Sequence, residues 1–75
     1  IKLSVYPNPT KDKLTLQLSN NELVNTKASI ISMSGQVVLQ FIILNRQEIV
    51  DLSGLPRGTY VLRLQDGWSQ KLVKE

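Results

Sequence analysis

Apolar and polar residues alternate along most of this chain, in short runs that end at turn-forming residues. Such alternation is typical of strands with one buried face. Seven runs can be counted, at 1–5, 13–18, 28–33, 36–44, 49–52, 60–65 and 68–74. Short runs with turn signals roughly every eight to twelve residues predict an all-β, immunoglobulin-like antiparallel β-sandwich of about seven strands.

The turn residues between the runs support this prediction. Pro7 and Pro9 end the first run because they cannot donate a ladder hydrogen bond, and Asn8 between them favours a turn. Gly35 and Gly67 each follow a polar residue between two runs and predict tight hairpins, where a positive φ is needed.

The fourth run, QVVLQFIIL (36–44), is apolar on both faces. It either lies centrally in the sandwich or offers one face to a partner. We expect the central position.

The stretch DLSGLPRGTYVLRL (51–64) predicts a braced corner. Asp51 and Ser53 can bond backbone N–H groups just ahead of them, and Ser53 can cap a single helical turn. The side chain of Leu55 would then pack against the bottom of the hydrophobic core.

In the second half of this corner, Pro56 and Gly58 occupy the second and fourth positions of a type I turn signature. Tyr60 follows near the start of a strand. This is the position of the tyrosine corner, in which a buried ring bonds upstream backbone through its hydroxyl.

Composition excludes most chemistry. The 75 residues include no cysteine and no histidine, and they carry a net charge of +3. The length suits one small domain. The nine Lys and Arg are spread along the chain, which favours solvated strand faces over an anionic partner, nucleic acid included. No apolar run approaches the roughly 18 residues of a membrane span. Because Ile1 begins in a strand pattern, we expect a piece of a longer protein.

Catalytic and metal-binding residues are not grouped in the sequence. The six carboxylates are scattered, and the closest pair, Glu48 and Asp51, would point to opposite faces of a strand. The serines lack a histidine base, and neither a phosphate loop nor a calcium loop is present. Trp68 is expected to pack on the core or at an edge. We therefore predict a protein that is not an enzyme and has no cofactor or metal.

Four stretches, in order, resemble the type A C-terminal sorting domain of the type IX (Por) secretion system of Bacteroidota. They are VYPNPTKDKLTL (5–16), ASIISMSGQVV (28–38), IVDLSGLPRGTYVLRL (49–64) and QKLVK (70–74). Ser32 and Gln36 depart from the family pattern, which often has Asp and a basic residue there.

The resemblance implies a folded tag that directs a cargo domain on its N-terminal side through the outer-membrane type IX translocon. A surface sortase-like peptidase would then usually remove the tag. The tag would pass through the periplasm and reach the cell surface or the medium with its cargo.

Recognition is assigned to two segments. The terminal strand, Lys71, Leu72, Val73 and Lys74, is the first choice, because an edge strand offers backbone pairing to a receptor. Pro7, Asn8 and Pro9 are either a recognition element or the first crossover. The other residues that match family motifs have structural explanations: Gly35, Asp51, Leu52, Ser53, Leu55, Gly58, Tyr60 and Gly67.

Two other functions fit the fold alone. One is an immunoglobulin-like adhesion or carbohydrate-binding module of a secreted protein, which would show an exposed aromatic or polar platform. The other is an inert spacer.

Overall fold

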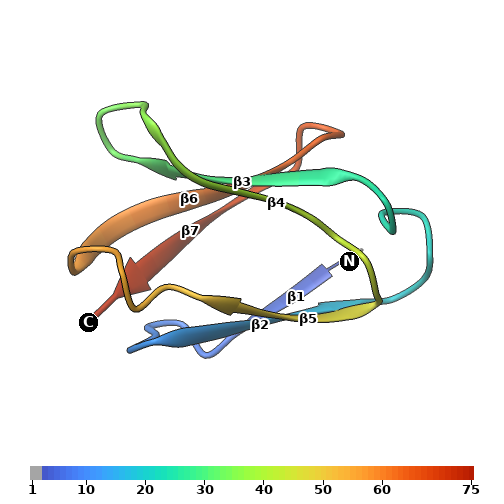
Figure 1. Cartoon of the computed structure of the whole chain (residues 1–75), viewed down its shortest axis with the longest axis horizontal. Coiled ribbons are helices and arrows are strands. Elements are labelled where there is room, and N and C mark those ends of the chain that lie inside the picture. Colours follow the sequence, from blue (N-terminus) through green and yellow to red (C-terminus); the bar gives the residue numbers. More distant parts are fainter. Residues whose placement is uncertain (1–2) are drawn as a thin grey trace.

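The computed structural model describes residues 3–75, which form seven antiparallel strands in two packed sheets (Figure 1). This confirms the predicted sandwich, although the run predicted at 1–5 lies partly outside the described residues. The strands are β1 (Leu3–Tyr6), β2 (Lys13–Leu18), β3 (Lys27–Ser32), β4 (Val37–Ile42), β5 (Gln47–Asp51), β6 (Gly58–Leu64) and β7 (Ser69–Lys74). Residues 3–75 include no helix with the length and hydropathy that a membrane crossing requires.

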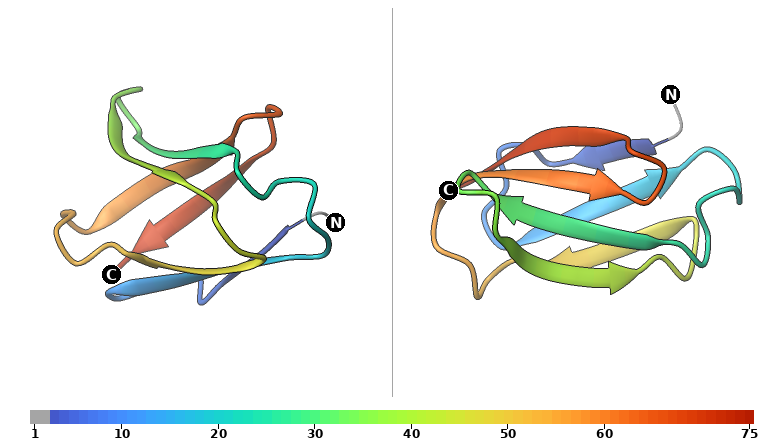
Figure 2. Two further views of the ribbon diagram at one scale, coloured as in Figure 1. Left: turned by 45° about the vertical axis from the view of Figure 1, so that its right-hand side comes forward. Right: turned by 90° about the horizontal axis from the view of Figure 1, so that it is seen from above.

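The two sheets have the orders β1-β2-β5 and β4-β3-β6-β7 (Figure 2). These are the A-B-E and C′-C-F-G orders of an immunoglobulin-type sandwich, with β4 in the C′ position. Consecutive strands β2 and β3 belong to different sheets, as do β4 and β5. The chain therefore crosses between the layers at the ends of the sandwich.

The core lies between the sheets and consists mainly of leucine and isoleucine. Leu14 and Leu16 of β2 are fully buried, and so are Ile30 and Leu62 of the other sheet. Each such side chain stabilises the fold by roughly 1.5–3 kcal/mol relative to an exposed position. The buried hydrophobic cluster comprises Leu3, Leu14, Leu16, Leu18, Leu23, Ala28, Ile30, Ile43, Val50, Leu52, Tyr60, Leu62, Leu64 and Leu72.

Both predicted hairpins are present. Gly35 has a φ of +90° in the turn between β3 and β4, and Gly67 has a φ of +96° in the turn between β6 and β7. In the first turn, the Ser32 hydroxyl accepts a 3.3 Å hydrogen bond from the backbone N–H of Gln36. Ser32 thus performs the N–H-accepting role of an aspartate at this turn.

The predicted central position of run 36–44 is wrong. β4 is the outermost strand of its sheet, with Val37 and Ile42 49% and 46% exposed and Leu44 beyond its end 62% exposed. Apolar residues on both faces do not identify a central strand here, because apolar side chains such as Ile42 remain exposed to solvent on this edge strand. Phe41 packs against the core from this edge.

The loop between β2 and β3 contributes a core residue that its polar sequence did not indicate. Leu23 is only 5% exposed. The Thr26 hydroxyl donates a 2.7 Å hydrogen bond to the carbonyl oxygen of Leu23, and this bond holds the loop over the end of the core.

Candidate functional site: the covered edge of β7

The two segments assigned to recognition are in direct contact. Asn8 lies beside the outer edge of β7, where its side-chain oxygen accepts a 3.0 Å hydrogen bond from Val73 N. Its side-chain nitrogen donates a 3.0 Å hydrogen bond to the carbonyl oxygen of Lys71. The amide of Asn8 therefore pairs with β7 as the peptide group of a neighbouring strand would.

Thr10 continues this pairing through its backbone. Its N–H donates a 2.9 Å hydrogen bond to Val73 O, and its carbonyl accepts a 2.8 Å hydrogen bond from Glu75 N. These bonds make an isolated parallel bridge between Thr10 and Lys74. Thr10 is 1% exposed, and its hydroxyl donates a 2.6 Å bond to Lys13 O. The short PNPT sequence has no periodicity that could have identified Thr10 as buried.

The outer edge of β7 is thus bonded over Lys71–Glu75, although β7 is the last strand of its sheet. Less of this edge remains for a receptor strand than an open edge strand would offer. The predicted first crossover is wrong, because β1 and β2 are antiparallel neighbours in one sheet. The segment around Asn8 connects these two strands and forms part of the same surface as β7.

The four residues of the terminal strand have different surroundings. Leu72 is a core residue at 1% exposure, whereas Lys71 is exposed and Val73 is half-buried. Lys74 is 9% exposed and shares the inner face with Leu72. A lysine in such a place covers apolar surface with its methylene stem while its ammonium reaches water. Lys71 is therefore the charge that this strand presents most openly.

β6 supports β7 directly. Gly58 is paired with Lys74, and Tyr60 with Leu72. The ring of Tyr60 is buried, and its hydroxyl donates a hydrogen bond to the carbonyl oxygen of Pro56. The predicted tyrosine corner is confirmed. Gly58 has a φ of +155°, which a side chain would strain.

The exit from β5 is capped as predicted, with one difference in the turn. The Asp51 carboxylate accepts a 2.9 Å hydrogen bond from Ser53 N. A hydrogen bond from Leu55 N to Leu52 O then closes a turn. This bonded turn lies three residues before the predicted type I turn, and Ser53 lies in it rather than in a helical turn. Leu55 packs against the core as expected.

Asp51 is the group in this corner with a shifted pKa. Hydrogen bonds from Ser53, first from its backbone N–H and then from its hydroxyl, hold the pKa of the Asp51 carboxyl below its ordinary value of 3.8. Desolvation opposes this lowering, and the positive charge of Lys13 on β2 contributes the smallest effect, which again lowers the pKa. The carboxylate therefore acts as a charged cap.

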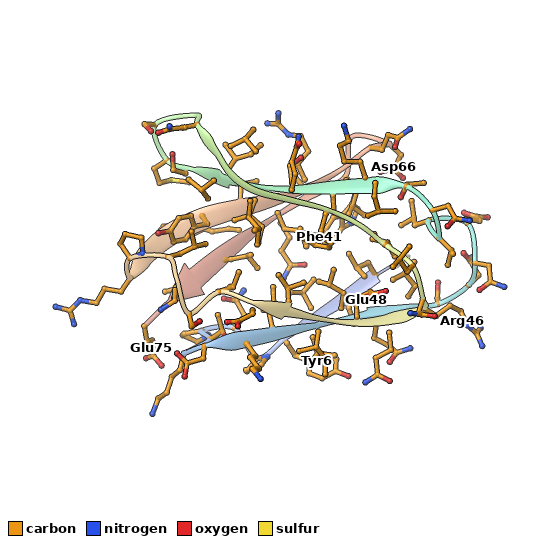
Figure 3. All side chains as sticks on the ribbon, viewed as in Figure 1. Tyr6, Phe41, Arg46, Glu48, Asp66 and Glu75 are labelled. Atoms are coloured by element: carbon orange, nitrogen blue, oxygen red, sulfur yellow. The ribbon has the colours of Figure 1, made fainter. Side chains whose placement is uncertain are left out.

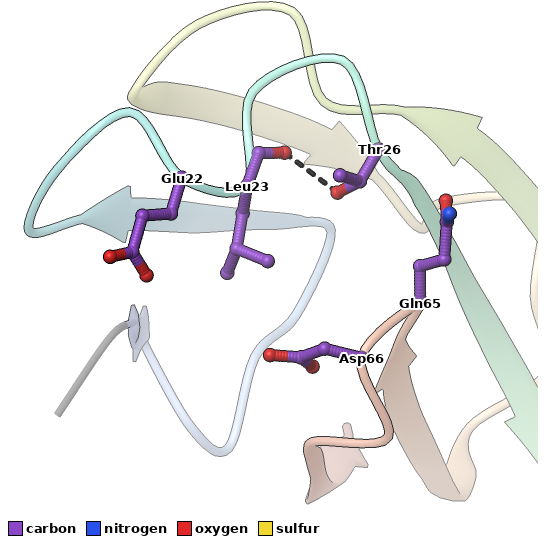
Figure 4. Close-up of a pocket in the computed structure, with 5 residues that line it drawn as sticks. All are labelled: Glu22, Leu23, Thr26, Gln65 and Asp66. Atoms are coloured by element: carbon purple, nitrogen blue, oxygen red, sulfur yellow. Dashed lines mark hydrogen bonds between the residues drawn. The ribbon is translucent and has the colours of Figure 1, made fainter.

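The hollows of the surface contain no catalytic arrangement among the described residues. One of about 300 Å³ is lined by Glu22, Leu23, Thr26, Gln65 and Asp66, with two carboxylates at its rim (Figure 4). The Asp66 carboxylate caps the last turn by accepting a 3.0 Å bond from Trp68 N. Residues 3–75 hold no group of three potential metal ligands. Trp68 is half-buried against the core, as predicted, and forms no open aromatic platform.

These features define a class of protein: a small immunoglobulin-type sandwich whose last strand is bound by the segment after β1. The chain belongs to the secretion system C-terminal sorting domain family, whose sequence model matches residues 4–75. No curated protein matches the chain. Members of this family act as secretion signals of the type IX secretion system and are not catalytic.

Family membership also indicates which machinery the domain meets and where its carrier protein is delivered. The domain interacts with the type IX secretion machinery, and the protein that carries it is secreted or attached to the cell surface.

Proposed function

We propose that this domain directs a cargo on its N-terminal side from the periplasm through the outer-membrane type IX translocon. A surface sortase-like peptidase then removes the domain. The recognised surface consists of Pro7, Asn8 and Pro9 together with Lys71–Lys74, and residues 1–75 form the single sorting domain of a longer protein.

One observation carries this assignment. The Asn8 side chain bonds both Lys71 and Val73, so two segments 63 and 65 residues apart in sequence form one continuous surface. Both segments match the family motifs. A receptor that binds this surface would detect whether the first and last parts of the domain have come together, which favours folded over unfolded tags.

The exposed side chains of this surface are better candidates for contact than its backbone. Pro7 and Pro9 are exposed, and so is Lys71. The outward backbone groups of Val73 are already bonded by Asn8 and Thr10. We therefore propose that the translocon contacts the two proline rings and the Lys71 ammonium.

The experiment fuses residues 1–75 behind a periplasmic reporter in a host with a type IX system. Lys71→Glu should retain the reporter in the periplasm, because it reverses the exposed charge without touching the core. Arg46→Glu is the matched control: Arg46 is exposed and lies at the opposite end of the molecule from Glu75 (Figure 3). It should be exported normally.

Thermal melting of each purified domain separates recognition from folding. If Lys71→Glu is folded and exported like the unsubstituted domain, the assignment of this surface fails. If the unsubstituted fusion itself stays periplasmic while folded, the proposed export through the translocon fails.

A further inference from the structure

The two edges of the four-stranded sheet differ. The edge of β7 is covered by Asn8 and Thr10, whereas β4 has no neighbour on its outer side among residues 3–75. In the view from above (Figure 2, right), β4 forms the opposite border of the sheet from β7. The exposed edge of a β-sheet is normally protected by charged residues, by proline or by a segment that covers it. The residues of β4, VVLQFI, include neither a charge nor a proline.

The open backbone groups of β4 can be identified. Ile43 N donates to Thr26 O on the β3 side of the strand. Because successive peptide groups of an antiparallel strand point to opposite sides, those of Gln40 and Ile42 point away from β3. A bulge interrupts the pairing near Val37, so the regular part of the edge is Leu39–Ile42.

A trough of about 240 Å³ lies beside this edge. Leu39, Phe41 and Ile42 of β4 line one side, and Ile49 and Val50 of β5 line the other, together with the carboxylates of Glu48 and Asp51. Both carboxylates already accept backbone hydrogen bonds, Glu48 from Leu44 N and Asn45 N, and Asp51 from Ser53 N. A strand paired with β4 would direct alternate side chains into this trough, where apolar residues would contact its apolar lining.

The other face of such a strand would meet positive charge. The outer face of the four-stranded sheet carries Lys27, Arg63 and Lys71, and its four strands contain no carboxylate. Lys27 lines a hollow of about 210 Å³ with Gln40, Phe41 and Ile42, so its side chain lies next to the open edge. Ser29 is paired with both Arg63 and Gln40, which places Arg63 and Lys27 on the same outer face.

We propose that the outer edge of β4 binds an extended segment of a partner protein as an additional strand. The segment has apolar residues facing the trough and acidic residues facing Lys27 and Arg63. Strand addition gives affinity through the backbone and selectivity through alternate side chains. A second copy is a poorer occupant, because each copy carries a net charge of +3 and pairing would set two basic faces side by side in one sheet. This inference does not depend on recognition at β7.

The test uses the 75-residue chain labelled with ¹⁵N and a short capped peptide that alternates valine and glutamate. Saturating peptide should slow amide hydrogen exchange at Gln40 and Ile42 by about tenfold. The valine–lysine peptide of the same length should bind more weakly. The proposal is overturned if the valine–glutamate peptide leaves hydrogen exchange at both amides unchanged. It is also overturned if the peptide slows exchange only at amides on the edge of β7.

Two variants test the contacts. Gln40→Pro removes an outward N–H at an edge position where proline is tolerated, so the folded variant should lose binding, whereas Gln40→Thr should keep it. Lys27→Glu should reverse the preference between the two peptides, and an unaltered preference would refute the charge assignment. Concentration-dependent dimers of the chain alone that protect Gln40 and Ile42 would assign the edge to a second copy instead.

Discussion

Asn8 and Val73 are 65 residues apart in the sequence, yet the side-chain oxygen of Asn8 accepts a 3.0 Å hydrogen bond from Val73 N. The same side-chain amide also donates a hydrogen bond to Lys71 O. The side chain of Asn8 therefore pairs with the backbone of β7 as a peptide group of an adjacent strand would. It also explains why an asparagine suits the position between two prolines, since only an amide offers a donor and an acceptor with peptide geometry.

Asn8→Ala should destabilise the domain by about 1 kcal/mol, because two exposed hydrogen bonds are lost and water replaces them only in part. Urea unfolding measures the change. Amide exchange at Val73 should become faster in the native state. Asn8→Asp is the informative control: it keeps an acceptor for Val73 N but places a carboxylate beside Lys71 O, so it should not restore stability. Unaltered exchange at Val73 in Asn8→Ala would contradict the contact.

Gly58→Val should destabilise the domain by roughly 1–3 kcal/mol, because its φ of +155° disfavours any side chain. Beyond Gly58 and its two neighbours in the chain, no heavy atom lies within 4 Å of the place a Cβ would take, so the cost comes from the backbone and not from a clash. Gly54→Ala is the matched control. Gly54 has the same free space without a left-handed φ, and its substitution should change stability by less than about 0.5 kcal/mol. Equal melting temperatures for the two variants would refute this explanation.

Tyr60→Phe should destabilise the domain by about 0.5–1.5 kcal/mol, since it removes the bond to Pro56 O and leaves the ring in place. Tyr60→Leu removes the ring as well and should have a larger effect, because the side chain is 7% exposed and belongs to the core cluster. Denaturant unfolding compares the two. If Tyr60→Phe is as stable as the unsubstituted domain, the tyrosine corner does not brace this fold.

Stability should fall in acid partly through Asp51. Its folded pKa is held below 3.8, so its contribution is present above that value and is lost as the pH falls through the folded pKa. Asp51→Asn should therefore show a smaller loss of stability from about pH 5 to about pH 2. Ser53→Ala keeps the N–H donor and should retain part of the dependence. Chemical denaturation at several pH values measures the free energy of unfolding. If this free energy falls equally with pH in Asp51→Asn and in the unsubstituted domain, Asp51 does not act as a charged cap.

Deletion of Lys71–Glu75 should unfold the domain and abolish export, because Leu72 is 1% exposed and the strand anchors both β6 and Asn8. Circular dichroism would show the loss of folding, and the reporter fusion would show the loss of export. A truncated domain that still melts cooperatively would show that the other six strands suffice.

The strands and the corner could be predicted from the sequence because their causes are local. The alternation at 13–18 identifies β2, and the spacing from Asp51 to Tyr60 indicates both the cap and the tyrosine corner. Each depends on residues within a few positions of one another.

The order of strands in a sheet is not local. Nothing within residues 36–44 shows whether a neighbour lies beyond β4, so its edge position could not be predicted. The contact between Asn8 and β7 also joins segments that are far apart in the sequence, so it could not be predicted either. A turn residue between two prolines indicates a change of direction but not the strand against which its side chain will lie.

The bridge from Thr10 to Lys74 has a consequence for the time at which the domain becomes folded. Contacts between segments so distant in sequence form late, because a long loop must close first, and folds dominated by them are slow. During synthesis β1 and β2 are made long before β7, so the bridge, and with it the cover on the edge of β7, forms only after the seventh strand has been added. Until then the sandwich is incomplete, and we expect its partly exposed core to stay open to chaperones and transport factors that a finished sandwich would exclude.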